Sequence, residues 1–384
     1  MRILLTACPA YGHILPLLPL ARAAQRQGHE VLFATGSDLV GQLHVRGIAA
    51  EVAGPTFAGM QAIRAEAFPE FDSLPGEQRL PVSGVGLFGL PALPRAADLE
   101  VIARRWRPDL VVHEVLELGG AILARRLGVP SVTHGFGPFY PYHPEILAAA
   151  TDAIGHAALA EGLLHGPYVD ISPASLNPPV PHPFRNRYSL RPSPGERDQA
   201  HDLSRLAGLP RRPAVYLTLG TVFNRAPGVL ASAVEAIRDL PVNLVVTTGP
   251  GMQPEALGPQ PDHVVVGQFL PQTLVLERSD LLVSQCGAGG LFGALTHGLP
   301  QVCLPLGADQ FLNAEAVERV GGGVTVLPTE FSVDAVRRAV AEVLQDSSYT
   351  DAAGRVQAEI ESMPSPDDVL EQLVLDVDDE LGAA

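Results

Sequence analysis

The stretch Ser284-Gln-Cys-Gly-Ala-Gly-Gly290 decides how the second half of this 384-residue chain folds. The apolar run Leu281-Leu-Val283 precedes it, and the apolar run Leu291-Phe-Gly-Ala-Leu295 follows it directly. This order predicts a buried strand, a glycine-rich turn and the start of a helix. Glycines let backbone amides approach an anion, and a helix N-terminus adds N–H groups and partial positive charge. The stretch therefore indicates a phosphate or diphosphate site, although the same pattern also serves close packing in many α/β folds.

A second strand-like run, Gly298-Leu-Pro-Gln-Val-Cys-Leu-Pro305, leads into Gly307-Ala-Asp-Gln-Phe-Leu-Asn-Ala314. Asp309, Gln310 and Asn313 thus gather where this strand ends. Doubly wound sheets bind their ligands at the carboxyl ends of strands, and one acid with two amides suits a polyhydroxylated ligand such as a sugar. A loop whose Asp and Asn merely cap a helix is the alternative.

The alternation of strands and helices extends over both halves of the chain. In the first half, residues 2–8, 110–113 and 131–133 are predicted strands, residues 28–34 are a predicted turn and strand, and helices are predicted at 15–27 and 121–127. In the second half, the predicted strands are 214–219, 243–247, 263–266, 281–284, 302–304 and 324–327. Such βαβ arrays favour parallel sheets with right-handed crossovers.

Three segments interrupt this alternation. Residues 53–95 and 135–168 are rich in Gly, Pro and aromatic side chains, which predicts long irregular insertions at strand ends, where binding residues often lie. Residues 177–213 are rich in Pro and Arg, which predicts an extended connector between two domains.

Composition excludes several classes of function. The formal net charge is −16, which argues against nucleic acid and against anionic membrane surfaces as partners, because both bind through basic patches. All 26 basic residues are arginines, so Schiff-base chemistry on a lysine is excluded. No apolar run approaches the ~20 residues of a membrane helix.

The three cysteines, Cys8, Cys286 and Cys303, are odd in number and far apart. They show neither a disulfide framework nor the spacing of a zinc site, and we expect a reduced, cytoplasmic protein. The sequence also shows no Asp-x-Asp pair at a strand end and no His/Cys cluster. We therefore expect no metal site.

Four motifs of the second half, read together, resemble the donor-binding signature of nucleotide-sugar-dependent glycosyltransferases: Gly267-Gln-Phe-Leu-Pro-Gln272, Ser284-Gln-Cys-Gly-Ala-Gly-Gly290, Gly298-Leu-Pro-Gln301 and Gly307-Ala-Asp-Gln310. In the first half, Gly12-His-Ile-Leu-Pro-Leu-Leu-Pro-Leu-Ala21 and Pro108-Asp-Leu-Val-Val-His-Glu114 match the same family. The chain is most similar to the bacterial enzymes that glycosylate antibiotics and other natural products. The resemblance extends from residue 2 to about residue 323.

The resemblance implies the GT-B fold, in which two doubly wound, Rossmann-like parallel-sheet domains face each other across a cleft. The acceptor-binding domain is expected at residues 1–195, a linker at 196–212 and the nucleotide-sugar domain at 213–365. The last helix, 366–384, is expected to cross back to the first domain. The implied reaction is metal-independent and cofactor-free, and it moves a sugar from a dTDP- or UDP-sugar with inversion to a hydrophobic aglycone.

The family assigns donor contacts to the second half of the chain. The glycine-rich turn would hold the diphosphate, a hydroxyl at Thr221 would assist it, and Phe269 would stack on the nucleobase. The implied donor-binding residues are Thr221, Phe269, Leu270, Gln285, Gly287, Ala288, Gly289, Gly290, Asp309 and Gln310. Where most relatives carry His and then Gly, this chain has Gln285 and Cys286; Gln donates a hydrogen bond but brings no positive charge. A core role for Phe269 is the alternative.

His13 is the implied general base, since a neutral imidazole accepts a proton near physiological pH. Glu114 stands where relatives carry an acid, usually Asp, that orients this histidine. Their alternatives are a histidine that only caps or packs at a helix start and a solvated acid at a strand end.

The predicted acceptor-binding residues are aromatic: Phe57, Phe68, Phe88, Phe136, Phe139 and Tyr142. Two rival functions stay open at this point. One is a nucleotide-sugar epimerase, for which the required acids and arginines are not evident. The other is a non-catalytic homologue that binds a nucleotide or natural product, which the exchanges at Gln285, Cys286 and Glu114 motivate. The sequence leaves homodimer formation open.

Overall fold

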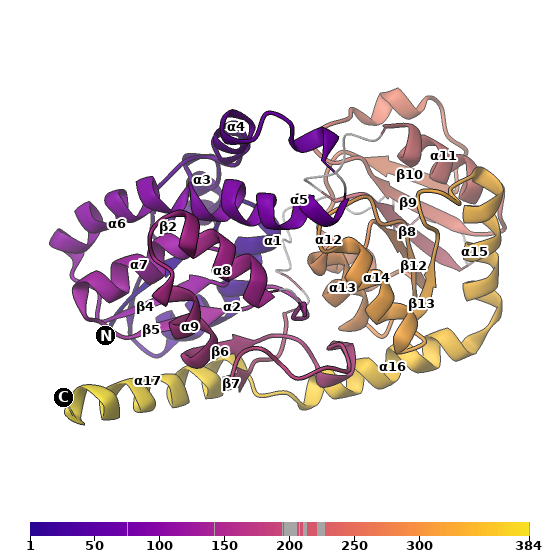
Figure 1. Ribbon diagram of the computed structural model, residues 1–384. Helices are drawn as coiled ribbons and strands as arrows, with labels where there is room; N and C mark the ends of the chain where they lie inside the picture. Colours follow the sequence, from indigo (N-terminus) through magenta and orange to yellow (C-terminus); the bar gives the residue numbers. More distant parts are fainter. Residues whose placement is uncertain are drawn as a thin grey trace. The chain divides into compact units, whose positions relative to one another are not determined.

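The computed structural model describes residues 1–384 apart from 75, 142, 194, 196–205, 207, 210–212, 221–226 and 384. Internal contacts divide the chain into two units (Figure 1). The N-terminal unit comprises Met1–Ser172, Pro178–Arg191 and Pro364–Ala384. The C-terminal unit comprises Pro173–Asn177 and Pro192–Met363. The linker expected at 196–212 lies almost wholly outside the described residues.

The N-terminal unit is built on a seven-stranded sheet of order β3-β2-β1-β4-β5-β6-β7, with parallel pairing throughout. Its strands are β1 (Arg2–Thr6), β2 (Glu30–Thr35), β3 (Ala50–Val52), β4 (Leu110–Glu114), β5 (Ser131–His134), β6 (Pro167–Asp170) and β7 (Asn186–Ser189). Its helical elements are α1 (Tyr11–Ile14), η1 (Leu15–Leu17), α2 (Leu18–Arg26), α3 (Ser37–Val45), α4 (Phe57–Ala67), η2 (Phe71–Ser73), α5 (Gly76–Ser83), η3 (Gly84–Gly89), α6 (Ala92–Trp106), α7 (Leu118–Leu127), α8 (His143–Ala153), α9 (Ala158–His165) and α17 (Pro366–Ala383).

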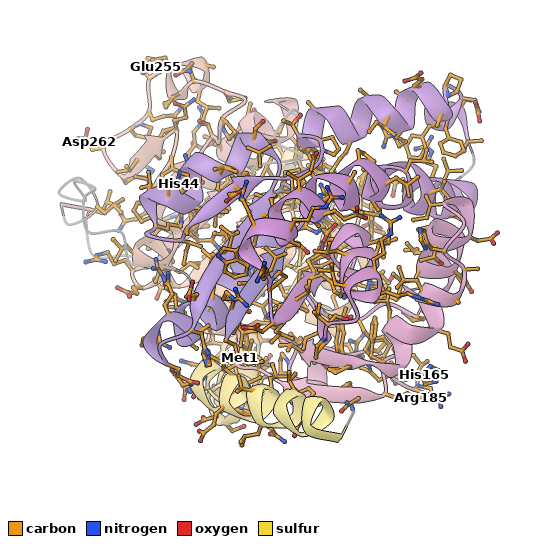
Figure 2. The ribbon with its side chains drawn as sticks, turned by 90° about the vertical axis from the view of Figure 1, so that its left-hand side faces the viewer. Met1, His44, His165, Arg185, Glu255 and Asp262 are labelled. Carbon is orange, nitrogen blue, oxygen red and sulfur yellow. The ribbon has the colours of Figure 1, made fainter. Side chains whose placement is uncertain are left out.

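The central strands of this sheet are buried on both faces, as runs rich in Leu and Val require in a parallel sheet. Leu4 of β1 and Val111 of β4 pack in one core cluster with residues of α6 and α7, which therefore cover one face. Their strand neighbours point to the other face and are also buried. Helix α17 packs against α2, and Figure 2 shows it as the yellow helix below the labelled Met1.

The C-terminal unit repeats this architecture with a six-stranded parallel sheet of order β10-β9-β8-β11-β12-β13. Its strands are β8 (Ala214–Thr218), β9 (Asn243–Thr247), β10 (Val264–Gly267), β11 (Leu281–Ser284), β12 (Gln301–Cys303) and β13 (Gly323–Thr325). Its helical elements are η4 (Ala174–Leu176), α11 (Pro227–Arg238), η5 (Pro254–Leu257), α12 (Gln272–Leu276), α13 (Ala288–Leu295), α14 (Gln310–Arg319), α15 (Val333–Gln345) and α16 (Ser347–Ser362). One core cluster joins the sheet to α11 and α15, and a second joins its other face to α12 and α13. The predicted fold class, two doubly wound parallel-sheet domains, is thus confirmed.

Several local predictions are corrected. The helix expected at 15–27 begins as α1 at Tyr11 and passes through the 3₁₀ turn η1, because Pro16 and Pro19 cannot donate to the α-helical ladder. Residues 53–95 and 135–168 are largely helical instead of irregular. The glycines that suggested loops there allow close packing: a Cβ on Gly86 would lie 2.6 Å from Arg64, and one on Gly89 would lie 2.8 Å from the backbone of Ala150.

The connector expected at 177–213 contains a strand. Residues of β7 pair in parallel with β6 and extend the N-terminal sheet. Most of the side chains of β7 are exposed, so the strand carries no apolar alternation that a sequence pattern would reveal. None of the described helices combines the length and the apolarity that a membrane span requires.

Buried histidines predict an acid-sensitive N-terminal unit. Burial lowers the pKa of His134 to about 4 and that of His143 to about 3, from a usual value near 6.5. Below pH 6.5 the two histidines become protonated in the unfolded chain but stay neutral in the folded protein. The free energy of unfolding therefore falls as the pH drops. The slope is at most about 1.4 kcal/mol per pH unit for each histidine.

The test is urea unfolding of wild type and His143→Gln at pH 7 and pH 5. Fluorescence of Trp106, the chain's one tryptophan, reports on the N-terminal unit because this residue ends α6. The variant should lose less stability between the two pH values than wild type does. His165→Gln, at the exposed residue labelled in Figure 2, is the control and should behave as wild type. Equal slopes for all three proteins would contradict the prediction.

Candidate active site

His13 and Glu114 lie together at the carboxyl ends of two neighbouring strands. Strands β1 and β4 pair in parallel, with Thr6 opposite His113. Glu114 is the last residue of β4, and His13 lies in α1, a few residues beyond β1. Nδ1 of His13 is 3.0 Å from Oε2 of Glu114, and the two side chains are 18% and 0% exposed. A buried carboxylate thus lies against a partly exposed imidazole.

The backbone fixes the second oxygen of Glu114. The N–H of Leu116 donates a 2.9 Å hydrogen bond to Oε1, and Glu117 N–H donates a 2.8 Å bond to the Glu114 carbonyl. The side chain therefore folds back on the loop that follows its own strand. This geometry accommodates the methylene by which Glu exceeds the more usual Asp.

Glu117 supports this loop and was missed by the sequence analysis. It is fully buried, caps α7 by accepting from Gly119 N–H and Gly120 N–H, and accepts a short hydrogen bond from the Thr6 hydroxyl. Its Oε1 also lies 3.4 Å from the guanidinium of Arg95, which is 1% exposed. An acidic residue directly before a helix start is a capping signal that could have identified it.

Two aromatic rings flank the imidazole of His13. The ring of Phe136 lies 4.6 Å from it and that of Phe88 lies 6.3 Å from it, between ring centroids. Phe88 belongs to η3 and Phe136 follows β5, so the segments 53–95 and 135–168 both reach the histidine. The site therefore combines a polar pair with an apolar wall.

Three of the other predicted acceptor residues, Phe57, Phe68 and Phe139, are among the described residues. Phe57 begins α4 and Phe68 follows its last residue, and both are half-buried. Phe139 is 2% exposed and its ring packs 4.1 Å from that of His182, so it serves the core. Tyr142 is outside the described residues.

Cys8 completes a cluster that the sequence analysis did not foresee. The thiol of Cys8, an imidazole nitrogen of His13 and a carboxylate oxygen of Glu114 all lie within 4.8 Å of one another. The expectation that no His/Cys cluster exists is thus corrected, because strand pairing brings together residues that are 5 and more than 100 positions apart. Burial, together with the carboxylates of Glu114 and Glu117, raises the pKa of the Cys8 thiol.

The glycine-rich turn has the predicted strand–turn–helix form. Strand β11 ends at Ser284, Gly287 is the N-cap of α13, and α13 begins at Ala288. The hydroxyl of Ser284 accepts a 3.0 Å hydrogen bond from Cys286 N–H. Cys286 adopts the left-handed region with a φ of 61°, a conformation that favours glycine. The first-turn amides of α13 are thereby presented at the carboxyl edge of the sheet, where an anion would bind.

Gln285 lies against the loop after β8. A Cβ on Gly220 would lie 2.2 Å from its Nε2, so the amide fills the space that this glycine leaves open. Thr221, the next residue, is outside the described residues. Further along the edge, Phe269 is 61% exposed, while Leu270 packs against Gly267.

Asn313 connects the two predicted donor loops. Its Nδ2 group donates 2.9 Å hydrogen bonds to the carbonyl of Cys286 and to Oδ2 of Asp309, and its side chain is fully buried. Gln310 is 3% exposed, and its Oε1 accepts from Leu306 N–H and Gly307 N–H. The side-chain oxygen of Gln310 thus stabilises the loop, so a sugar hydroxyl would have to bind to the Nε2 group of this residue.

Comparisons with known proteins cover nearly the whole chain. Residues 93–180 match the N-terminal domain of the family described as erythromycin biosynthesis protein CIII-like, and residues 231–375 match its C-terminal domain. The L-demethylnoviosyl transferase of Streptomyces niveus is 30% identical over 97% of each chain.

Solved glycosyltransferase structures also align with nearly the whole chain. The spinosyn rhamnosyltransferase SpnG complexed with thymidine diphosphate aligns with a TM-score of 0.79 at 25% identity, over 97% of this chain and 100% of that one. Its complex with spinosyn aglycone aligns with a TM-score of 0.79 at 26% identity over the same shares.

Asn313→Ala should loosen the donor loops. The change leaves the Cys286 carbonyl without its side-chain donor in a buried place, which costs about 1–3 kcal/mol. We expect lower stability of the C-terminal unit, measured by hydrogen exchange, and weaker binding of thymidine diphosphate, measured by calorimetry. Asn243→Ala is the matched control, because Asn243 is also buried in this unit, at the start of β9. Nucleotide affinities that fall equally in both variants would refute a specific role for Asn313.

Proposed function

The chain belongs to the erythromycin biosynthesis protein CIII-like family of natural-product glycosyltransferases, and we propose that it transfers a sugar from a dTDP- or UDP-sugar to a hydrophobic aglycone. The observation that carries the proposal is the 3.0 Å contact of His13 with the buried carboxylate of Glu114. A buried acid against a partly exposed imidazole is the arrangement of a general base with its orienting group.

In the proposed reaction His13 removes the proton of an acceptor hydroxyl. Glu114 engages Nδ1 and so fixes the tautomer, which makes Nε2 the nitrogen that takes the proton. The carboxylate also stabilises the imidazolium that forms. The new bond joins the acceptor oxygen to the anomeric carbon as the bond to the diphosphate breaks, which inverts the configuration at that carbon.

The glycine-rich turn is the proposed site of the leaving diphosphate. Negative charge grows on the diphosphate as the sugar bond breaks, and amides at a helix N-terminus stabilise charge that develops there. Gln285 would donate a neutral hydrogen bond, and Phe269, with its exposed ring, would stack on the base. Stabilising the leaving diphosphate in this way requires no divalent ion.

The acceptor wall is proposed from Phe88 and Phe136. Both rings lie beside His13, so an apolar aglycone packed on them would bring its hydroxyl to the imidazole. SpnG has been solved with thymidine diphosphate and with an aglycone, which supports these two ligand classes for this chain. The non-catalytic alternative fits less well, because nothing about simple binding requires a buried acid on the histidine.

His13→Ala should lower turnover by about 10²–10⁴-fold, the range for loss of a general base. Binding of thymidine diphosphate should change less than about tenfold, because the proposed donor contacts all lie in the C-terminal unit. Glu114→Gln should cause a smaller loss, since it removes the orienting charge and leaves the base. His44→Ala, at the exposed histidine labelled in Figure 2, is the control. Near-normal turnover of His13→Ala would exclude this base.

Nucleotide binding should not need magnesium. We expect thymidine or uridine diphosphate to bind with micromolar affinity, about −8 kcal/mol, in the presence of EDTA. The measurement is calorimetry with EDTA and, separately, with excess Mg²⁺. Binding that occurs only with Mg²⁺ would overturn the metal-independent mechanism.

A further inference from the structure

The cluster of Cys8, His13 and Glu114 has a donor set that the transfer reaction does not use in full. Its ligand atoms are a thiol sulfur, an imidazole nitrogen and a carboxylate oxygen, all within 4.8 Å of one another. Among the residues that the structure describes, this is the one such group of three. Neither general-base catalysis nor orientation of the imidazole requires the thiol.

This donor set matches a divalent cation that favours sulfur and nitrogen. Zinc sites with three protein ligands use Cys, His and carboxylate groups at about 2.0–2.3 Å and keep a fourth position open. Tetrahedral geometry at these bond lengths separates the ligand atoms by about 3.3–3.7 Å. The His13 and Glu114 atoms, 3.0 Å apart, would have to separate by a few tenths of an ångström, and the Cys8 sulfur, within 4.8 Å of both, would have to approach them by up to about 1 Å. The partly exposed His13 offers an entry path that Cys8 and Glu114, both buried, do not.

The local charges also favour a cation. The carboxylate of Glu114 lies beside the thiol and places negative potential there, while Arg95 pairs with Glu117. The same negative potential that opposes a thiolate stabilises a divalent ion placed between sulfur and carboxylate. A bound metal in turn deprotonates a coordinating thiol.

We propose that Cys8, His13 and Glu114 bind a thiophilic divalent cation such as Zn²⁺, and that the bound ion inactivates His13 as a base. On binding, the Cys8 thiol releases its proton to solvent and forms the metal–sulfur bond. Nδ1 of His13, the nitrogen that contacts Glu114, binds the metal, and the imidazole proton moves from Nδ1 to Nε2 through solvent. An imidazole protonated at Nε2 cannot accept the proton of an acceptor hydroxyl. Metal binding is independent of the proposed transferase function, whereas the inhibition rests on it.

Cobalt titration tests the binding site directly. Co²⁺ added to the reduced full-length protein should give one equivalent of a thiolate-to-cobalt absorption band. Cys8→Ala should weaken the binding by roughly 100-fold or more and remove the band, since it deletes a ligand. The matched control is the double variant Cys286→Ala/Cys303→Ala, which removes the two buried thiols of the C-terminal unit and should keep the band. Circular dichroism checks folding, and Cys8→Ser replaces Cys8→Ala if the alanine variant does not fold.

Three results would overturn the site: no band in wild type, a band that persists in the Cys8 variant, or a band that disappears in the double variant.

The inhibition arm uses Zn²⁺ in a transfer assay. Wild type should lose activity in proportion to the occupancy of the site and regain it when the Zn²⁺ is chelated. Relative to its own metal-free rate, Cys8→Ala should need at least roughly tenfold more Zn²⁺ for the same inhibition. Equal sensitivity of the two proteins would overturn the inhibitory role. If the chain shows no transfer at all, the proposed function fails, and the cobalt titration still decides the metal site.

Discussion

Glu117 is a fully buried carboxylate on which the geometry of the N-terminal site depends. It accepts hydrogen bonds from the Thr6 hydroxyl on β1 and from two backbone amides at the start of α7, and it pairs with Arg95 of α6. A buried ion pair of this kind adds little net stability, but removing one partner leaves an uncompensated charge and costs about 3–5 kcal/mol. Glu117 therefore works mainly as a positional constraint. It holds the loop from 115 to 117 against the end of β1.

The position of Glu114 follows from this constraint. Its carbonyl accepts from Glu117 N–H and its Oε1 accepts from Leu116 N–H, so the fixed loop also fixes the carboxylate. The remaining oxygen is then directed at His13. A side chain one methylene longer than Asp thus contacts the imidazole while its other oxygen accepts from the loop.

The C-terminal unit uses the same kind of support with different groups. Here a neutral amide, Asn313, joins the turn after β11 to the loop after β12 through the Cys286 carbonyl and Asp309. Gln310 stabilises the second loop by accepting two backbone N–H groups. The groups that hold these loops are side-chain amides, backbone groups and the half-buried carboxylate of Asp309. The two units thus share a fold and differ in how their loops are held.

The sequence by itself determined the fold class, the family and most of the strands. Unbroken apolar runs such as 281–283 must be buried on both faces, and the motifs around His13 and the glycine-rich turn occur in family order. The sequence did not predict η3, because glycines that allow close packing cannot be told from loop glycines in a sequence. It did not predict β7, because an exposed edge strand lacks a regular alternation of apolar residues. Only the tertiary structure decided that Cys8 meets His13 and Glu114, that Glu117 and Arg95 form a buried pair, and that Phe139 belongs to the core. Parallel pairing of β1 with β4 joins residues more than 100 positions apart, and no local pattern records that proximity.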